Sequence, residues 1–455
     1  MRTEILMPAL SPAMTDGRIA KWHVREGQTV AAGDVIAEIA DASATMEIEA
    51  ADAGRVESIL VPAGTAGVKV NTPIAVIRAE RTAARLESVA VGVTALSGPD
   101  VPAPPRRNGA AKRPAQPGET PQRSATGDCQ ILTYREALRD ALAEEMRRDA
   151  DVFLMGVDVA QNRGAPKVSQ GLIDEFGPAR VITTPPLEEA FTGLAVGAAF
   201  AGLKPVVEFQ SWAIAFQAMH QILGVAAETY HVLGGEIAVP IVLRGPNGWA
   251  PGVPGQMSRC FASLFAHVPG LKVVAPASPA DAKGLLKAAI RDPAPVIVLE
   301  SELLYAASGP VPLAADWLVP IGTAHIARPG RHLSIVAYGR AVGTALMAAH
   351  DLARDGIDAE VVDLRSLRPL DLETVLSSVA RTRRLLTVEE GWPMCSLGSE
   401  VCASVAIGAF RILAAPPVRV AGADVPMPYA ASLEAAALPD PERVVGAAKS
   451  LLSAA

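Results

Sequence analysis

The chain has 455 residues, of which 50% are hydrophobic and 20% are charged, and its formal net charge is −7. This length favours about three domains of roughly 150 residues each, with ample apolar residues for buried cores. The acidic balance argues against nucleic-acid binding, and no run of about 18 apolar residues exists to span a membrane. The N-terminus lacks a signal-peptide core, and the four cysteines form no Cys-X-X-Cys pair. We therefore expect a cytoplasmic protein with free thiols and neither a zinc knuckle nor a disulfide framework.

Residues 1–78 are predicted to form a small all-β domain. Short runs in which apolar and polar residues alternate are separated by turns rich in small residues. Short, evenly spaced strands of this kind are typical of a compact sandwich or flattened barrel. The expected strands are Ile19–Trp22, Val35–Ile39, Thr45–Glu49, Arg55–Val61 and Ile74–Ile77.

Residues 79–129 have a different composition and are predicted to be a linker. Seven prolines from Pro99 to Pro121 are mixed with small polar residues and a short basic run, Arg106–Arg113. Such a segment buries too little apolar surface to fold, and proline keeps it extended.

Residues 130–310 are predicted to form an α/β domain. Thr133 and Glu136 have the spacing of a capping box, which would open a helix that continues through Met146. Continuous apolar strands that alternate with helical patterns imply a parallel sheet covered on both faces, with the functional site in the loops at the strand ends. The expected strands are Val152–Gly156, Pro205–Phe209, Val239–Arg244, Leu271–Ala275 and Val296–Glu300.

The stretch from Val181 to Gly193 carries the candidate catalytic residue. An apolar run and a Pro-Pro turn place Glu188 just before a Gly/Ala-rich segment, whose small residues allow a helix to pack closely. A carboxylate at such an interface is costly unless it has a partner or a function. The structural alternative is a glutamate favoured by the helix dipole, and the adjacent Glu189 fits that alternative equally well.

Four motifs in the first 78 residues carry a family resemblance: Leu6–Gly17, Val24–Gly27, Gly33–Asp34 and Ala44–Ala50. Together they are similar to the lipoyl domains of 2-oxoacid dehydrogenase complexes. In that family a hairpin lysine two residues before Thr-Met-Glu is joined to lipoate through an amide. Ser43 stands at that place here, and a serine hydroxyl cannot form the stable amide. We therefore expect a lipoyl-like domain without covalent lipoate.

Residues 130–455 carry a second resemblance nearly end to end. The motifs are Gly156–Gln161, Lys167–Leu172, Arg244–Gly248, Pro269–Val274, Asp281–Leu286, Val361–Leu370, Thr387–Trp392 and Gly422–Tyr429. In this order they are similar to the β subunit of the pyruvate dehydrogenase decarboxylase component, a transketolase-like family. The resemblance implies a pyrimidine-binding α/β domain over 130–310. It also implies a transketolase C-terminal α/β domain over 320–455, with a strand at Leu333–Tyr338 and a helix through His350.

The resemblance gives Glu188 a catalytic role. In this family the glutamate at that place hydrogen-bonds the pyrimidine nitrogen of thiamine diphosphate, and the shared proton favours the tautomer that activates the cofactor. The resemblance also places Gln210 and Ile214 among the cofactor-binding residues, with Ile214 where an aromatic ring is usual. Glu189 is left as a surface or capping residue.

The resemblance further implies a structural potassium ion bound by backbone carbonyls. Main-chain oxygens suit such a hard cation and need no particular side chain. The alternative is an ordinary helix end before Pro293, whose exposed carbonyls meet water. The expected ligands are the carbonyls of Ile241, Ala289, Ile290, Asp292 and Ala294.

The chain lacks the Gly-Asp-Gly motif with which enzymes of this class hold Mg²⁺ and the diphosphate. The resemblance therefore implies a separate α chain that supplies this half of the site. The expected assembly is an α2β2 heterotetramer working with the acyltransferase core of the complex and its lipoyl domains.

Departures from the family leave alternatives open. Met257 stands where a histidine is usual, and a thioether packs but does not transfer protons. We expect a decarboxylase β subunit that oxidises a 2-oxoacid and transfers its acyl group to lipoyl acceptors. The alternatives are a catalytically weakened paralogue that acts as a scaffold or docking subunit, and an enzyme with a different acyl acceptor.

Overall fold

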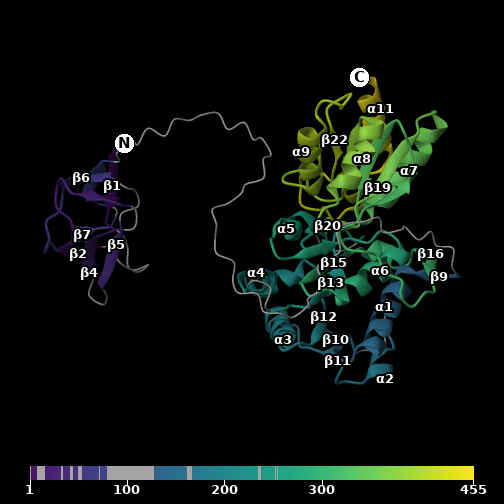
Figure 1. Cartoon of the computed structure of the whole chain (residues 1–455), viewed down its shortest axis with the longest axis horizontal. Helices are drawn as coiled ribbons and strands as arrows, with labels where there is room; N and C mark the ends of the chain where they lie inside the picture. The colour runs from purple at the N-terminus through teal and green to yellow at the C-terminus, as the bar shows by residue number, and fades with distance from the viewer. Residues whose placement is uncertain are drawn as a thin grey trace, which may run out of the picture. The chain divides into compact units, whose positions relative to one another are not determined.

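The computed structural model describes residues 2–7, 16–31, 34–40, 45–49, 54–70, 72–78, 128–160, 167–233, 237–251, 253 and 255–454. The chain divides into two compact units, Met1–Pro114 and Ala115–Ala455, which are described separately (Figure 1). Most of the expected linker, residues 79–127, lies outside the described residues. No helix in the described part of the chain is long and apolar enough to cross a membrane.

The first unit is all-β, as predicted. It contains two four-stranded antiparallel sheets, with strand orders β1-β8-β6-β3 and β5-β4-β2-β7. Met7, Ile19, Ile36 and Ile74 are fully buried between them. The strands are β1 (Arg2–Leu6), β2 (Asp16–Trp22), β3 (Thr29–Val30), β4 (Val35–Ala40), β5 (Thr45–Glu49), β6 (Gly54–Ile59), β7 (Val68–Lys69) and β8 (Pro73–Arg78).

Strands β4 and β5 precede and follow Ser43 in the sequence. They pair antiparallel, and Ala40 lies opposite Thr45. The two strands of the expected hairpin are therefore present. Ser43 itself lies outside the described residues.

The second unit begins with an α/β domain built on a seven-stranded sheet in the order β11-β10-β12-β13-β15-β14-β20. All neighbouring strands are parallel except the last pair. The strands of this domain are β9 (Cys129–Thr133), β10 (Val152–Gly156), β11 (Val181–Thr183), β12 (Lys204–Glu208), β13 (Val242–Pro246), β14 (Lys272–Val274), β15 (Val296–Glu300) and β16 (Ser308–Pro312). Its α-helices are α1 (Tyr134–Arg148), α2 (Leu172–Phe176), α3 (Glu188–Phe200), α4 (Glu228–Val232), α5 (Ala262–His267) and α6 (Pro279–Ile290). Short 3₁₀ helices cover Ile214–Ala218 and Glu302–Leu304, and a π-helix covers His220–Ala227.

The two faces of this sheet are buried in separate cores because side chains alternate along a strand. Val206 and Val242 face a core shared with α1 and α6. Their neighbours Val207 and Leu243 face the opposite core, which is shared with α3 and α5. The predicted capping box is confirmed, since the Thr133 hydroxyl accepts from the backbone N–H of Glu136 and the Glu136 carboxylate accepts from the N–H of Thr133.

One predicted strand is displaced. The run Val239–Arg244 was expected as a strand, but β13 begins at Val242. Proline at position 240 has no backbone N–H to donate to a neighbouring strand. The Val239 N–H bonds instead to the carbonyl of Pro293, 2.9 Å away.

The second domain of this unit is also α/β. Its five-stranded sheet has the order β17-β19-β18-β21-β22 and is parallel except for the β17–β19 pair. Helices α7 and α11 pack on one face, while α8 and α9 pack on the other. The elements are β17 (His325–Arg328), β18 (Leu333–Ala337), α7 (Ala341–Arg354), β19 (Ala359–Asp363), β20 (Ser366–Arg368), α8 (Leu372–Thr382), β21 (Leu385–Val388), α9 (Leu397–Ala409), β22 (Val418–Val420), α10 (Ala431–Ala437) and α11 (Pro441–Ser453).

The two α/β domains share one sheet. Strand β20 belongs to the second domain in sequence but pairs antiparallel with β14 of the first. Close by, the Arg365 guanidinium forms an ion pair with Asp281 of α6 at 2.6 Å. The core around α3 also continues into residues of the second domain, including Val362 and Val401. The two domains are therefore joined by backbone hydrogen bonds, an ion pair and a common core.

Candidate functional site

Glu188 is the first residue of α3 and is 4% exposed. One of its carboxyl oxygens, Oε2, is buried and has no hydrogen-bond partner among the described residues. Glu189 is exposed, so the structure separates the two adjacent glutamates that the sequence left as alternatives. A buried carboxyl oxygen without a partner is costly in a finished interior. Glu188 therefore has an open hydrogen-bonding position that a bound group can fill.

Two hydroxyl groups close to Glu188 in the sequence share this property. Thr184 lies in the turn after β11, and Thr192 lies one helical turn after Glu188 on the same face of α3. Both are buried, and neither hydroxyl has a hydrogen-bond partner in the described part of the chain. The start of α3 thus concentrates polar atoms that the chain leaves unpaired.

The loop after β12 carries the other two expected cofactor residues, Gln210 and Ile214. Gln210 is exposed, whereas Ile214 is half-buried at the start of the 3₁₀ helix. The neighbouring rings of Phe209 and Trp212 are almost fully buried, with centroids 5.4 Å apart, and anchor the loop in the core. This 3₁₀ helix packs against α3, which brings the Ile214 segment alongside the helix that Glu188 begins.

A buried ion network lies beneath this loop. Arg244, the middle residue of β13, is 1% exposed and donates to both carboxylate oxygens of Glu300, each 2.6 Å away. It also donates to Glu208, the last residue of β12. The Tyr305 hydroxyl donates to Glu300 at 2.7 Å. Sequence analysis assigned no role to these residues, although Arg244 belongs to a family motif and is the type of residue that pairs with two carboxylates.

Burial and charge pairing act against each other in this network. Burial alone would lower the pKa of Arg244, but the carboxylates of Glu300 and Glu208 outweigh it and raise that pKa. Burial raises the pKa of Glu208, and the positive charge of Arg244 opposes this shift. The network therefore ties the last residues of β12 and β15 to the middle of β13, the strand that lies between them in the sheet.

Met257 lies in the loop between β13 and α5 and is half-buried. The Ser211 hydroxyl donates to the Met257 carbonyl at 3.4 Å, so the Met257 loop contacts the loop that carries Gln210 and Ile214. His220, which lies in the π-helix, is exposed. The departure from the family at Met257 therefore falls beside the expected cofactor residues.

The five expected potassium ligands lie at the opposite end of the strands from this site. Hydrogen bonds join these segments: the Val239 N–H donates to the Pro293 carbonyl in the turn after α6 at 2.9 Å, and the N–H of Val296, the first residue of β15, donates to the Ile241 carbonyl at 2.9 Å. The carbonyl of Ala289 already accepts from the N–H of Asp292 at 3.2 Å. The Asp292 carboxylate accepts from Lys272 at 2.5 Å and from the N–H of Ala294 at 2.9 Å. The chain therefore gathers these residues at the beginning of the central strands β13 and β15.

Comparisons with known families agree with this architecture. Residues 130–307 match the transketolase pyrimidine-binding domain and residues 322–444 match the transketolase C-terminal domain. Residues 3–77 match the domain family described as biotin-requiring enzyme. A solved structure described as "Split gene transketolase, inactive beta4 tetramer" has the same fold, with a TM-score of 0.57, 22% identity, and coverage of 71% of this chain and 99% of that one. Fold and site thus define a transketolase-like protein of the thiamine diphosphate-dependent class.

Similar sequences narrow this class to one family. The chain is 49% identical over 460 residues to "Pyruvate dehydrogenase E1 component subunit beta" of Rhizobium meliloti (strain 1021), and the match covers 99% of each chain. It is 53% identical over 321 residues to the mitochondrial E1 subunit beta-2 of Oryza sativa subsp. japonica, covering 70% of this chain and 85% of that protein. For the mitochondrial subunit of Bos taurus, identity is 50% over 326 residues, with coverage of 71% and 91%. The chain belongs to the family of pyruvate dehydrogenase E1 component β subunits.

Proposed function

We propose that this chain is the β chain of a pyruvate dehydrogenase (acetyl-transferring) enzyme. With an α chain it would oxidatively decarboxylate a 2-oxoacid, pyruvate, and transfer the acyl group to lipoyl acceptors. The observation that carries the proposal is the buried, unpartnered carboxyl oxygen of Glu188 at the start of α3. Pyruvate as the substrate rests on the names of the E1 β relatives. The alternative of a scaffold without catalytic activity is not favoured by similarity over the whole chain.

The residues at the site fit a cofactor pyrimidine. When bound, thiamine diphosphate supplies the carbon nucleophile and the electron sink that decarboxylation of a 2-oxoacid requires. Glu188 would hold a proton against the pyrimidine ring nitrogen, because its free oxygen lies in a site shielded from water. Gln210 and Ile214 would line the same ring, Gln210 through its amide and Ile214 through apolar contact. This chain contributes positioning and proton transfer at the pyrimidine.

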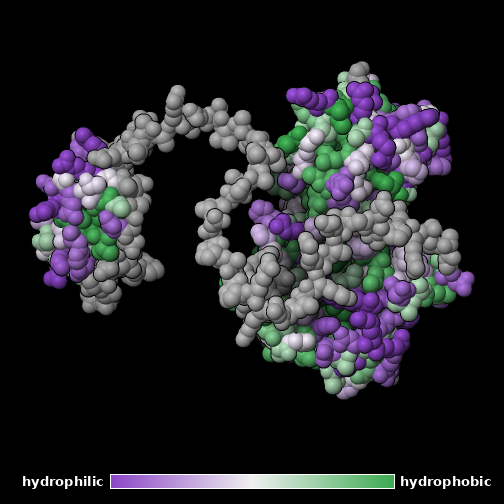
Figure 2. Space-filling model, viewed as in Figure 1, coloured by the Kyte–Doolittle hydropathy of each residue, from purple (hydrophilic) through white to green (hydrophobic). Residues whose placement is uncertain are grey.

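An α chain would supply the diphosphate half of the site together with Mg²⁺, in an α2β2 heterotetramer. The absence of Gly-Asp-Gly from the sequence supports this division. Large apolar side chains are exposed on both α/β domains, including Leu194, Val232, Ile407 and Phe410. Hydrophobic residues also reach the surface on the face shown in Figure 2. Exposed apolar residues of this size are common at protein interfaces, which suits a chain that works with partners.

A potassium ion bound by the carbonyls at the end of α6 is part of the proposal. The hydrogen bond from the Val239 N–H to the Pro293 carbonyl joins the segment that ends at Ile241 to the turn that holds the other expected ligands. Carbonyl oxygens that already accept one hydrogen bond keep a second lone pair for a cation. Cytoplasmic localisation stays a prediction from the sequence.

The test of the proposal is Glu188→Gln, made in the complex with the α chain. The amide is nearly isosteric, so folding and α-chain binding should be unchanged. Decarboxylation measured with an artificial electron acceptor should fall by about 10²–10⁴-fold, the usual contribution of a general acid or base.

Glu189→Gln is the matched control, because it makes the same change at the adjacent exposed residue. It should retain wild-type activity. Full decarboxylation in Glu188→Gln would refute the assignment. An equal loss in Glu189→Gln would mean that the wrong neighbour carries the function.

A further inference from the structure

The loop from Asn247 to Cys260, which carries Met257, is closed at its base. The Gly248 N–H donates to the Arg259 carbonyl at 2.9 Å, and the Phe261 N–H donates to the side-chain oxygen of Asn247 at 2.8 Å. These two hydrogen bonds hold the two ends of the loop together. We refer to residues 247–260 as the Met257 loop.

A carboxylate of the second α/β domain binds the backbone of this loop. Glu390, which follows β21, accepts a hydrogen bond from the backbone N–H of Trp249. Its other oxygen accepts from Arg340 at 2.9 Å, and the Arg340 guanidinium lies over the Trp249 ring, 5.6 Å from its centroid. The Glu390 side chain is 12% exposed, so the contact is largely shielded from water. Glu390 therefore connects a backbone atom of the loop to a side chain of the other domain.

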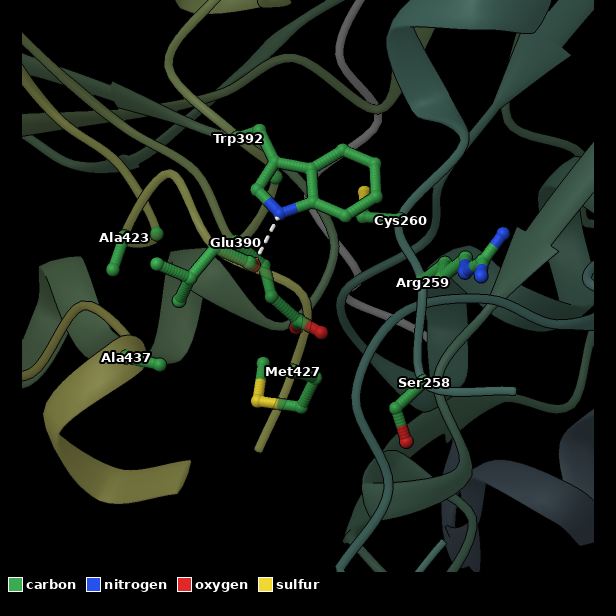
Figure 3. A pocket seen from close by; sticks show the side chains of 11 residues that line it. Ser258, Arg259, Cys260, Glu390, Trp392, Ala423, Met427 and Ala437 are labelled. Atoms are coloured by element: carbon green, nitrogen blue, oxygen red, sulfur yellow. Dashed lines mark hydrogen bonds between the residues drawn. The ribbon is translucent and has the colours of Figure 1, made fainter. Parts of the chain in front are cut away.

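Two glycines allow the loop to approach the second domain this closely. Gly248 has φ of +91°, and a Cβ at that position would overlap the Glu390 carboxylate. A Cβ at Gly255 would overlap the carbonyl oxygen of Met427. Figure 3 shows the Glu390 carboxylate pointing into the space between Met427 on one side and Ser258 of the loop on the other. A side chain at position 255 would therefore push the loop away from the second domain, and one at position 248 would displace the Glu390 carboxylate.

On its other side the loop meets the proposed catalytic site. The Ser211 hydroxyl donates to the Met257 carbonyl, which ties the loop to the segment bearing Gln210 and Ile214. The loop therefore contacts the second domain at Trp249 and, at Met257, the segment whose residues are proposed to line the cofactor pyrimidine.

We propose that Glu390 is a positioning residue, which sets the Met257 loop against the catalytic site by binding the Trp249 N–H. This inference rests on the proposed function for its kinetic consequence but not for the contact itself. Glu390 acts through the loop and does not touch the reacting atoms.

The experiment uses the full chain in complex with its α chain. Glu390→Ala removes both hydrogen bonds, whereas Glu390→Gln keeps an oxygen that can accept from Trp249. Gly255→Ala disturbs the loop independently, from the Met427 side. Glu442→Ala, an exposed glutamate of α11 in the same domain, is the control. Hydrogen exchange of the loop and steady-state decarboxylation are measured for each variant.

We expect amide exchange at residues 249–257 to become about 10- to 100-fold faster in Glu390→Ala, the range for losing one hydrogen bond to a charged group. Exchange of the buried strand β18 should stay unchanged, which separates local release from global unfolding. The kcat should fall by roughly 10- to 100-fold with little change in KM, as for a misplaced site. Gly255→Ala should show the same changes in exchange rate and kcat. Glu390→Gln should have an exchange rate and a kcat close to those of the wild type.

The proposal is overturned if loop exchange and kcat in Glu390→Ala match those of Glu442→Ala. It is also overturned if exchange accelerates while kcat is unchanged, because the loop would then be held for no catalytic purpose. Failure of the proposed function looks different: the wild-type complex itself would not decarboxylate 2-oxoacids, while the exchange data would still show whether Glu390 holds the loop.

Discussion

The buried ion network beneath the site gives the sharpest prediction about stability. Replacing Glu300 by glutamine removes one charge from the bidentate pair with Arg244 and retains the side-chain volume. The Arg244 guanidinium, 1% exposed, would be left with Glu208 as its acidic partner. Water cannot reach Arg244 to compensate for the lost charge. The Tyr305 hydroxyl would also lose its charged acceptor.

The expected cost follows from burial. Breaking a buried ion pair by removing one partner typically destabilises a protein by about 3–5 kcal/mol. Because Glu208 remains, we expect the lower end, about 3 kcal/mol. Each kcal/mol lowers the unfolding temperature by roughly 2–4 °C in domains of 150–250 residues, so the fall should be about 6–12 °C.

Thermal unfolding followed by circular dichroism measures this shift. Glu302→Gln is the matched control, since Glu302 is exposed and lies two residues further along the chain. It should leave the midpoint within about 1 °C, as expected for a surface substitution. A Glu300→Gln midpoint equal to that of the control would refute the reasoning, because the pair would then contribute nothing to the free energy of unfolding.

Three further predictions concern the lipoyl-like domain, the Met257 loop and the domain interface. Because Ser43 offers no amine, the protein from cells that make lipoate should show its unmodified mass by mass spectrometry, and a lipoyl-sized increase within residues 1–78 would contradict this. Because methionine does not transfer protons, Met257→His should raise the rate of acyl transfer to lipoyl domains more than the rate of decarboxylation. If the wild-type protein already transferred acyl groups as fast as it decarboxylates, this prediction would be contradicted. Burial, with a smaller contribution from Asp281, raises the pKa of Asp363 from 3.8 to about 8. The folded state then binds the Asp363 proton more tightly than the unfolded state does, so the stabilisation that this proton provides is lost as pH rises from about 4 to about 8. In Asp363→Asn the thermal unfolding temperature should therefore fall less over this pH range.

Periodicity and capping rules were sufficient for much of the fold. The helix after Thr133 and the strand Val296–Glu300 follow from local signals, and the structure has both where they were expected. The beginning of β13 at Val242 was missed, because Pro240 interrupts a run that is apolar throughout. The pairing of β20 with β14 was also missed, since about 90 residues separate the two strands in sequence and nothing local specifies their contact.

In the candidate site, too, features set by local sequence were predicted and features set by distant contacts were not. Glu188 was identified from a carboxylate next to a close-packing segment, and its burial agrees with that reasoning. The roles of Glu300 and Glu390 depend on contacts between distant segments, including one between two domains. Such contacts leave no periodic pattern in the sequence, because each one involves a single residue from each of two distant segments.

The strand that β20 adds to the sheet of the preceding domain affects how the chain can be divided. A fragment that ends after β16 would expose the open edge of β14, whose backbone groups normally pair with β20. Unpaired edge strands are templates for aggregation. The pyrimidine-binding domain expressed alone would therefore tend to self-associate, and gene fusions or rearrangements that preserve solubility would carry both α/β domains together. The described strands of the lipoyl-like domain pair only with one another, so this domain can be gained or lost as a separate module.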